Sequence, residues 1–149
     1  MGNCISDRYL IKYDNNTEEF TIKGKYRCKV VNIYDGDTCK VVMKFNGKYK
    51  RFNVRMEGYD SPEMKPSKSK KNRDKEIQAA KAAKEYLRTL VQKDGNQLVY
   101  ISCNGFDKYG RLLGSLYVKR WDKISVNQKM IDKNHGYTYN GGTKTDNFI

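Results

Sequence analysis

The chain is poor in several residue types on which whole classes of protein depend. Its 149 residues include one histidine, two prolines and four cysteines, and no run of consecutive apolar residues is longer than four. A single histidine excludes a histidine-rich zinc site, and such short apolar runs predict neither a membrane-spanning helix nor a secretory signal. The cysteines lack any Cys-x-x-Cys spacing, so we expect Cys28, Cys39 and Cys103 to be buried free thiols. These features predict an intracellular protein.

Acidic residues are also scarce relative to basic ones. The chain has 30 Lys and Arg against 17 Asp and Glu, which gives a formal net charge of +13. This excess is typical of proteins that bind phosphate polymers or anionic membranes, although it can also serve solubility alone. The length favours one domain, because a chain of about 150 residues buries roughly 70% of its unfolded surface.

Alternating apolar and polar residues predict a mainly β protein. Asn46-Gly47 marks a two-residue hairpin, and Ser125 to Gln128 matches a capping box at the start of a helix. We expect strands over residues 26–33, 39–45, 49–56, 98–104 and 112–118, and helices over residues 74–92 and 125–133. This order fits an α+β fold, mainly β: a five-stranded Greek-key barrel of the OB type with two or three helices.

The expected organisation has three parts. We expect residues 1–24 to form an N-terminal tail, residues 25–140 the OB-type domain, and residues 141–149 a flexible C-terminal tail. Within the domain, the basic stretch from Lys65 to Arg73 is expected to be a surface loop.

Two carboxylates are expected to meet at one edge of the predicted sheet. Asp37 ends the first predicted strand and Asp60 follows the third, and the first three strands pair as a meander. At an effective dielectric of about 20, two carboxylates about 4 Å apart repel by ~4 kcal/mol. A hard divalent cation would offset this repulsion, and oxygen ligands favour Ca²⁺ or Mg²⁺ over zinc.

Two arginines and a glutamate extend this set. Arg55 lies five residues before Asp60, and Arg111 ends the motif Asp-Lys-Tyr-Gly-Arg. Guanidinium groups suit phosphate oxygens, so carboxylates, a cation and arginines on a basic surface suit phosphodiester hydrolysis. With no histidine near these turns, Glu63 is the natural candidate for the base that orients the attacking water. Each residue alone is also an ordinary turn or surface residue.

Three motifs, in this order, resemble those of the thermonuclease, or staphylococcal-nuclease-like, family. They are DGDT at residues 35–38, R-x(4)-D-S-P-E from Arg55 to Glu63, and DKYGRLLG at residues 107–114. The resemblance covers roughly residues 26–139. It implies an OB-fold barrel and a Ca²⁺-dependent endonuclease that hydrolyses DNA and RNA with little sequence specificity. Water attack on phosphorus in such enzymes leaves 3′-phosphate ends.

The resemblance also implies a role for each matching residue. Asp37 and Asp60 match the Ca²⁺ carboxylates, and Ser61 matches a ligand that uses its main-chain carbonyl. Asp35 is expected just behind these ligands. The residues that match the catalytic trio are Arg55, Glu63 and Arg111.

Further matches concern the binding of substrate. Lys108 and Tyr109 match residues that contact a neighbouring phosphate, and Tyr137 or Tyr139 matches an aromatic wall beside a base. Tyr59 stands where the family prefers an aliphatic residue, which concerns packing rather than catalysis.

The N-terminal residues fit a lipidation pattern. Gly2, with Ser6 at the favoured position, predicts N-myristoylation, and Cys4 could take a palmitoyl chain. Two acyl chains give stable attachment where one does not. We therefore expect peripheral membrane attachment if the protein is made in a eukaryotic cell.

Two alternatives to a nuclease stay open. The first is a non-catalytic OB-fold module that binds nucleic acid, and the second is an acylated membrane adaptor whose basic loop binds anionic lipid. The first should lack several of the five proposed metal and catalytic residues, and the second leaves them without a purpose. We expect DNA and RNA as partners and a monomeric protein.

Overall fold

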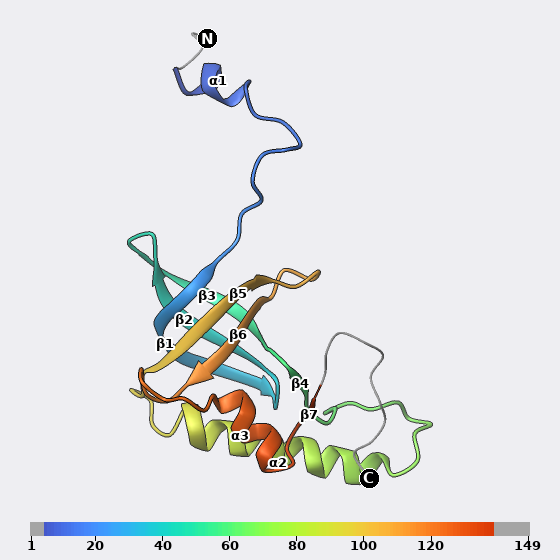
Figure 1. Ribbon diagram of the computed structural model, residues 1–149. Coiled ribbons are helices and arrows are strands. Elements are labelled where there is room, and N and C mark those ends of the chain that lie inside the picture. The colour runs from blue at the N-terminus through green and yellow to red at the C-terminus, as the bar shows by residue number, and fades with distance from the viewer. Residues whose placement is uncertain (1–4, 139–149) are drawn as a thin grey trace.

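Five strands form a closed barrel in the computed structural model, which describes residues 5–138 (Figure 1). The strands follow the order β1, β2, β3, β6, β5 around the barrel. Neighbours are antiparallel except β3 and β6, which are parallel. The bounds are β1 (Lys23–Asp35), β2 (Thr38–Phe45), β3 (Lys48–Met56), β5 (Val99–Phe106) and β6 (Leu112–Tyr117). The predicted five-stranded, mainly β barrel is confirmed.

Strand alternation decides which side chains fill the barrel. Along β2, Cys39, Val41 and Met43 are buried while their neighbours are partly or fully exposed. Asn46 and Gly47 turn the chain into β3 with positive φ angles of 49° and 77°, as a two-residue hairpin requires. The predicted free thiols Cys28, Cys39 and Cys103 are confirmed as buried and unbridged.

Two helices cover one end of the barrel (Figure 1). Helix α2 (Arg73–Val91) buries Ala80, Ala83, Leu87 and Val91 against the core. Helix α3 (Val126–Asp132) begins as predicted, because the Ser125 side chain accepts a hydrogen bond from the Gln128 N–H at 3.1 Å. Helix α2 also packs against the β1–β2 turn, where Ala83 lies close to Gly36.

Three short elements were not predicted. Helix α1 (Ile5–Leu10) lies within the expected N-terminal tail, and β1 begins at Lys23 rather than Tyr26. Strands β4 (Tyr59–Asp60) and β7 (Tyr137–Thr138) have two residues each and pair with one another beside the barrel. No helix within residues 5–138 is both long and apolar enough to cross a bilayer.

Candidate active site

An open pocket of about 460 Å³ lies where the β1–β2 turn, the end of β3, β4 and the β5–β6 loop converge. Strand register explains this convergence. Thr38 pairs with Arg55 across β2 and β3, and Arg55 pairs with Leu113 on β6, so Arg111 enters the same region. The pocket is lined by Asp35, Asp37, Thr38, Arg55, Asp60, Tyr109 and Arg111. It thus contains two of the three predicted catalytic residues and both predicted metal carboxylates.

Arg55 holds the two carboxylates together. Its Nη1 lies 3.3 Å from Asp37 Oδ2, and its Nη2 forms an ion pair with Asp60 Oδ1. The same guanidinium donates to the main-chain carbonyls of Met56 and Tyr59 at 2.8 and 2.9 Å. Asp37 is 6% exposed and Asp60 3% exposed. These nearly buried charges are therefore opposed by a cation that the protein itself supplies.

The β1–β2 turn is fixed from several sides. Asp37, which lies in this turn just beyond the end of β1, accepts hydrogen bonds from the Ser61 N–H at 2.8 Å and the Thr38 hydroxyl at 3.0 Å. The buried Tyr59 hydroxyl donates to the Gly36 carbonyl at 2.6 Å. A Cβ on Gly36 would lie 2.8 Å from the Cβ atoms of both Ser61 and Ala83, so this close packing requires glycine.

Asp35, which was expected behind the ligands, itself lines the pocket next to Asp37. Its Oδ1 accepts a hydrogen bond from the Asp37 N–H at 3.1 Å. Burial, followed by the negative charge of Asp37, raises the pKa of Asp35 to about 7. Three carboxylates, those of Asp35, Asp37 and Asp60, thus line the pocket beside the guanidinium of Arg55.

The β5–β6 loop is organised by Asp107. Its carboxylate accepts hydrogen bonds from the N–H groups of Tyr109 and Arg111, both at 2.9 Å, and from Arg111 Nε at 2.7 Å. Burial alone would raise the pKa of Asp107. The hydrogen bonds from Arg111 and Tyr109 outweigh this effect and hold the pKa below its ordinary value. The Arg111 guanidinium carbon also lies 5.5 Å from the centre of the Tyr109 ring. These contacts fix the direction of Arg111 at the pocket wall.

Glu63 is not among the described residues that line the pocket. It lies in the segment that follows β4, and its side chain is exposed. Its N–H donates to Glu76 Oε1 at 3.2 Å, and Glu76, buried in the first turn of α2, forms an ion pair with Lys70 at 2.6 Å. The chain after Asp60 is therefore anchored to α2 just where the predicted base lies.

The predicted substrate-binding residues lie in different places. Tyr109 lines the pocket, whereas Lys108 is exposed beside it with Nζ 5.1 Å from the centre of the Tyr109 ring. Tyr137 pairs with Asp60 across β4 and β7, which places it next to the pocket. Tyr139, like Gly2 and Cys4, lies outside the described residues.

The carboxylates form a partial set of ligands for a cation. Within residues 5–138, no three Asp, Glu, His or Cys side chains form a group that could hold a metal ion. Asp37 and Asp60 nevertheless present hard oxygen donors to one pocket, and main-chain carbonyls and water commonly complete calcium sites. The oxygen donors of Asp37 and Asp60 fit a hard divalent cation. Ser61, whose main-chain carbonyl is the third predicted ligand, directly follows Asp60 in the sequence.

Sequence reasoning missed three supporting residues. Asp107 and Tyr59 lie within the motifs, but the sequence assigned neither a role in the site. Glu76 lies in the predicted helix and was likewise given no role. A signal for Glu76 was available, since it lies one helical turn before Ala80 on the stripe that also contains Leu87. A charged residue on an apolar stripe indicates a buried partner.

Comparison with known proteins places the chain in a family. The sequence profile that describes staphylococcal nuclease homologues matches residues 53–146, a span that includes Arg55, Asp60, Glu63 and Arg111. The chain is also 26% identical over 117 residues to Endonuclease YhcR of Bacillus subtilis; the match covers 78% of this chain and 9% of that protein. These matches support a nuclease or nucleic-acid-binding role. The chain belongs to the family of staphylococcal nuclease homologues.

Proposed function

We propose that this protein is a Ca²⁺-dependent endonuclease that hydrolyses DNA and RNA with little sequence specificity and leaves 3′-phosphate ends. The observation that carries the proposal is the convergence of Asp37, Asp60, Arg55 and Arg111 on one open pocket. Acidic side chains alone would repel a phosphodiester, and basic side chains alone would bind it without activating it. Both kinds in one pocket, in a chain of net charge +13, suit hydrolysis of a polyanion.

In this proposal Asp37, Asp60 and the Ser61 carbonyl hold the cation. A bound Ca²⁺ ion would offset the two carboxylates and polarise the phosphate. Arg111, already directed by Asp107, donates to the phosphate oxygen that gains charge in the transition state. Arg55, in contact with both carboxylates, supplies a second positive charge to the pocket.

Glu63 acts as the base that orients water and accepts its proton. Its exposed side chain is accessible to water, and the hydrogen bond from its N–H to Glu76 restrains the backbone that carries it. Lys108 and Tyr109 contact the next phosphate, and Tyr137 or Tyr139 flanks a base. The leaving 5′ oxygen takes a proton from solvent.

A digestion assay tests the proposal. Plasmid DNA and structured RNA are incubated with the protein in Ca²⁺, in Mg²⁺ and in excess chelator, and the ends are probed with a 3′-phosphatase followed by polymerase extension. We expect cleavage of both polymers with Ca²⁺, none with chelator, and extension only after phosphatase treatment. Undiminished cleavage in chelator, or inactivity under all conditions, would contradict the proposal.

The alternative function is a non-catalytic module that binds nucleic acid. The open pocket and the basic surface would serve binding as well as cleavage. The same assay separates the two functions when it is paired with a gel-shift measurement. Retarded but intact nucleic acid at saturating protein and Ca²⁺ would favour the binding module.

We also propose a lipid anchor, where Met1 is the initiator residue and the cell is eukaryotic. Gly2 would be myristoylated and Cys4 palmitoylated, which would attach an intracellular monomer to a membrane. The support within the described residues is apolar exposure next to these positions, with Ile5, Leu10 and Ile11 exposed by 74, 69 and 79%. Membrane fractionation tests this, and a Gly2→Ala variant that stays in the membrane fraction would contradict it.

A further inference from the structure

Side chains on the outer face of β2 and β3 lead away from the candidate active site. Side chains alternate along a strand, so every second residue from Thr38 and from Arg55 faces outward. The outward cross-strand pairs are Thr38 with Arg55, Lys40 with Asn53, Val42 with Arg51, and Lys44 with Tyr49. The last pair is six residues along each strand from the first, a distance of about 20 Å at roughly 3.3 Å per residue. One continuous face therefore joins the pocket to the far end of the hairpin.

This face carries a basic strip, defined here as five cations of β1, β2 and β3 that lie between the pocket and the far end of the hairpin, together with Tyr49. Its cations are Arg27, Lys29, Lys40, Lys44 and Arg51. None of the five forms an ion pair with another described residue. The one carboxylate within these three strands is Asp35, at the end next to the pocket. The positive charge of the strip is therefore uncompensated.

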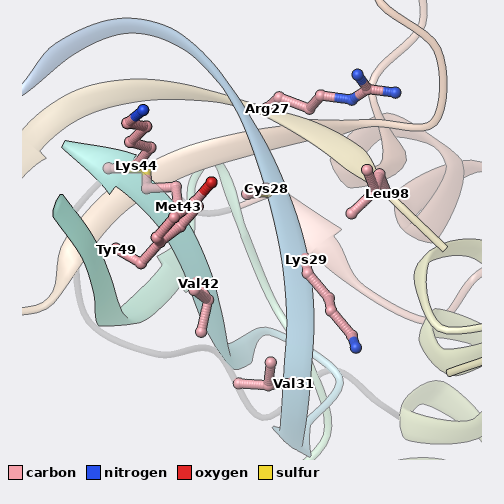
Figure 2. Close-up of a pocket in the computed structure, with 9 residues that line it drawn as sticks. All are labelled: Arg27, Cys28, Lys29, Val31, Val42, Met43, Lys44, Tyr49 and Leu98. Atoms are coloured by element: carbon pink, nitrogen blue, oxygen red, sulfur yellow. The ribbon is translucent and has the colours of Figure 1, made fainter. Parts of the chain in front are cut away.

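A groove of about 580 Å³ lies at the far end of the strip (Figure 2). Val31, Val42 and Leu98 contribute apolar surface from three strands or their ends, and Cys28 and Met43 lie on the core side. The cations at its edges are Arg27, Lys29 and Lys44. Among the described residues that line this groove, none is acidic.

Tyr49 gives the groove an aromatic surface. Its side chain is 75% exposed, and Lys44 Nζ lies 5.9 Å from the centre of its ring. Figure 2 shows the two side chains on neighbouring strands, beside Val42. The ring is accessible from solvent beside the apolar groove, so a base could stack on it.

We propose that the basic strip is an extended binding track for single-stranded nucleic acid. It would hold the part of the substrate that lies several nucleotides from the scissile bond, with phosphates on the cations and a base on Tyr49. The inference rests on the proposed nuclease function and deepens it. Cationic grooves with aromatic surfaces bind single strands in this way, and OB folds use the face of strands 2 and 3 for it.

A competing partner is an anionic membrane, which uncompensated lysines would also attract. The observations favour nucleic acid, because the cations span β1, β2 and β3 and continue through Lys40 to Thr38, which lines the pocket. The apolar groove and the exposed ring also match bases, which alternate with phosphates along a strand. Lipid binding is kept as an outcome of the test.

The test compares two triple variants of equal charge change. The strip variant combines Lys29→Gln, Lys44→Gln and Arg51→Gln, and the control combines Lys81→Gln, Lys93→Gln and Lys133→Gln, which are exposed residues on or next to the helices. Binding of a fluorescent oligothymidylate of about 16 nucleotides is measured by anisotropy against salt, in a Glu63→Gln background so that the probe survives. Cleavage of the same oligonucleotide and of a dinucleotide is measured with proteins that retain Glu63.

We expect the strip variant to bind the long probe roughly tenfold more weakly and to flatten the log–log salt slope by about 2, since each neutralised phosphate of a single strand contributes about 0.7. The KM for the long substrate should rise, while kcat/KM for the dinucleotide stays unchanged. Tyr49→Ala should weaken binding of the long probe about fivefold or more, and Tyr49→Phe should not. The control variant should match the parent in the salt slope and in the KM for the long substrate.

An unchanged salt slope and KM in the strip variant would overturn the track. So would a variant that keeps its affinity for the oligonucleotide but no longer binds phosphatidylserine-containing vesicles, because the strip would then face lipid. A parent that binds the oligonucleotide through the strip but cleaves neither substrate would contradict the nuclease function and still support the track. Melting curves confirm that every variant is folded.

Discussion

The candidate active site and the basic strip share the outer face of β3, yet they use cations in opposite ways. In the pocket, Arg55 contacts Asp37 and Asp60, and Arg111 is held by Asp107. In the strip, by contrast, none of the five cations has a carboxylate partner among the described residues. A guanidinium fixed by a carboxylate keeps its direction before substrate arrives, which suits transition-state stabilisation. An unpaired surface cation contributes affinity that depends on salt.

The two regions should therefore respond differently to substitution. Changes in the pocket should lower turnover or stability, whereas changes on the basic surface should lower affinity.

Replacing Arg111 or Glu63 should break the chemistry while binding survives. Arg111→Ala and Glu63→Ala should each lower kcat by about 100-fold or more, because both groups act mainly in the transition state. Cleavage rates and probe anisotropy are measured together at fixed salt. Near-normal cleavage by either variant would remove that residue from the mechanism, and a parallel fall in binding would place it in substrate affinity instead.

Replacing Arg55 should destabilise the protein by leaving two nearly buried carboxylates unopposed. We expect Arg55→Ala to lower the free energy of unfolding by about 3–5 kcal/mol without added metal. Added Ca²⁺ should raise its Tm more than that of the parent, because a cation would replace the missing positive charge. Thermal unfolding in chelator and in Ca²⁺ measures both effects. Arg55→Lys is the control that keeps the charge, and an equal Ca²⁺ response in parent and Arg55→Ala would argue against a cation at these carboxylates.

Replacing Glu76 should disturb Glu63 from a distance. Glu76→Ala removes the acceptor for the Glu63 N–H and the partner of Lys70, so we expect kcat to fall by up to about 100-fold. Glu76→Gln retains an acceptor and should recover part of this activity. Steady-state kinetics provide the measurement, with Glu85→Gln, an exposed change on the same helix, as the control. Full activity of Glu76→Ala would show that the anchor is unnecessary.

Substitutions in the basic loop should have the smallest effect. Changing Lys65, Lys68 and Lys71 to Gln should lower affinity evenly across sequences and flatten the salt slope by about 0.7–0.9 for each phosphate that the loop no longer neutralises. All three side chains are exposed. Binding titrations at several salt concentrations give the slope. A slope identical to that of the parent would take the loop out of the substrate path.

Local signals predicted most of the barrel. Apolar and polar residues alternate along β2 and β3 because every second side chain, among them Cys39, Val41 and Val54, is buried in the barrel. Asn46 and Gly47 have the positive φ angles that their turn needs. The meeting of Asp37 and Asp60 followed from the strand order alone. These features depend on near neighbours or on simple pairing, which sequence patterns record.

Features that depend on distant contacts were not visible. Strands β4 and β7 have two residues each, too few for a period to show, and their pairing joins Asp60 to Tyr137. The hydrogen bond from Tyr59 to the Gly36 carbonyl spans 23 residues, and that from the Glu63 N–H to Glu76 spans 13. The position of Glu63 outside the pocket lining follows from the path of the chain after β4, which no spacing specifies.

The most direct test of the nuclease centre is the dependence of cleavage on free Ca²⁺ in the parent and in Asp60→Asn. The variant removes one carboxylate charge next to Arg55 and changes the side-chain volume little. We expect saturable activation of the parent, and for Asp60→Asn a midpoint at much higher Ca²⁺ or no cleavage at all. The same Ca²⁺ midpoint and rate in both proteins would contradict the assignment of this pocket.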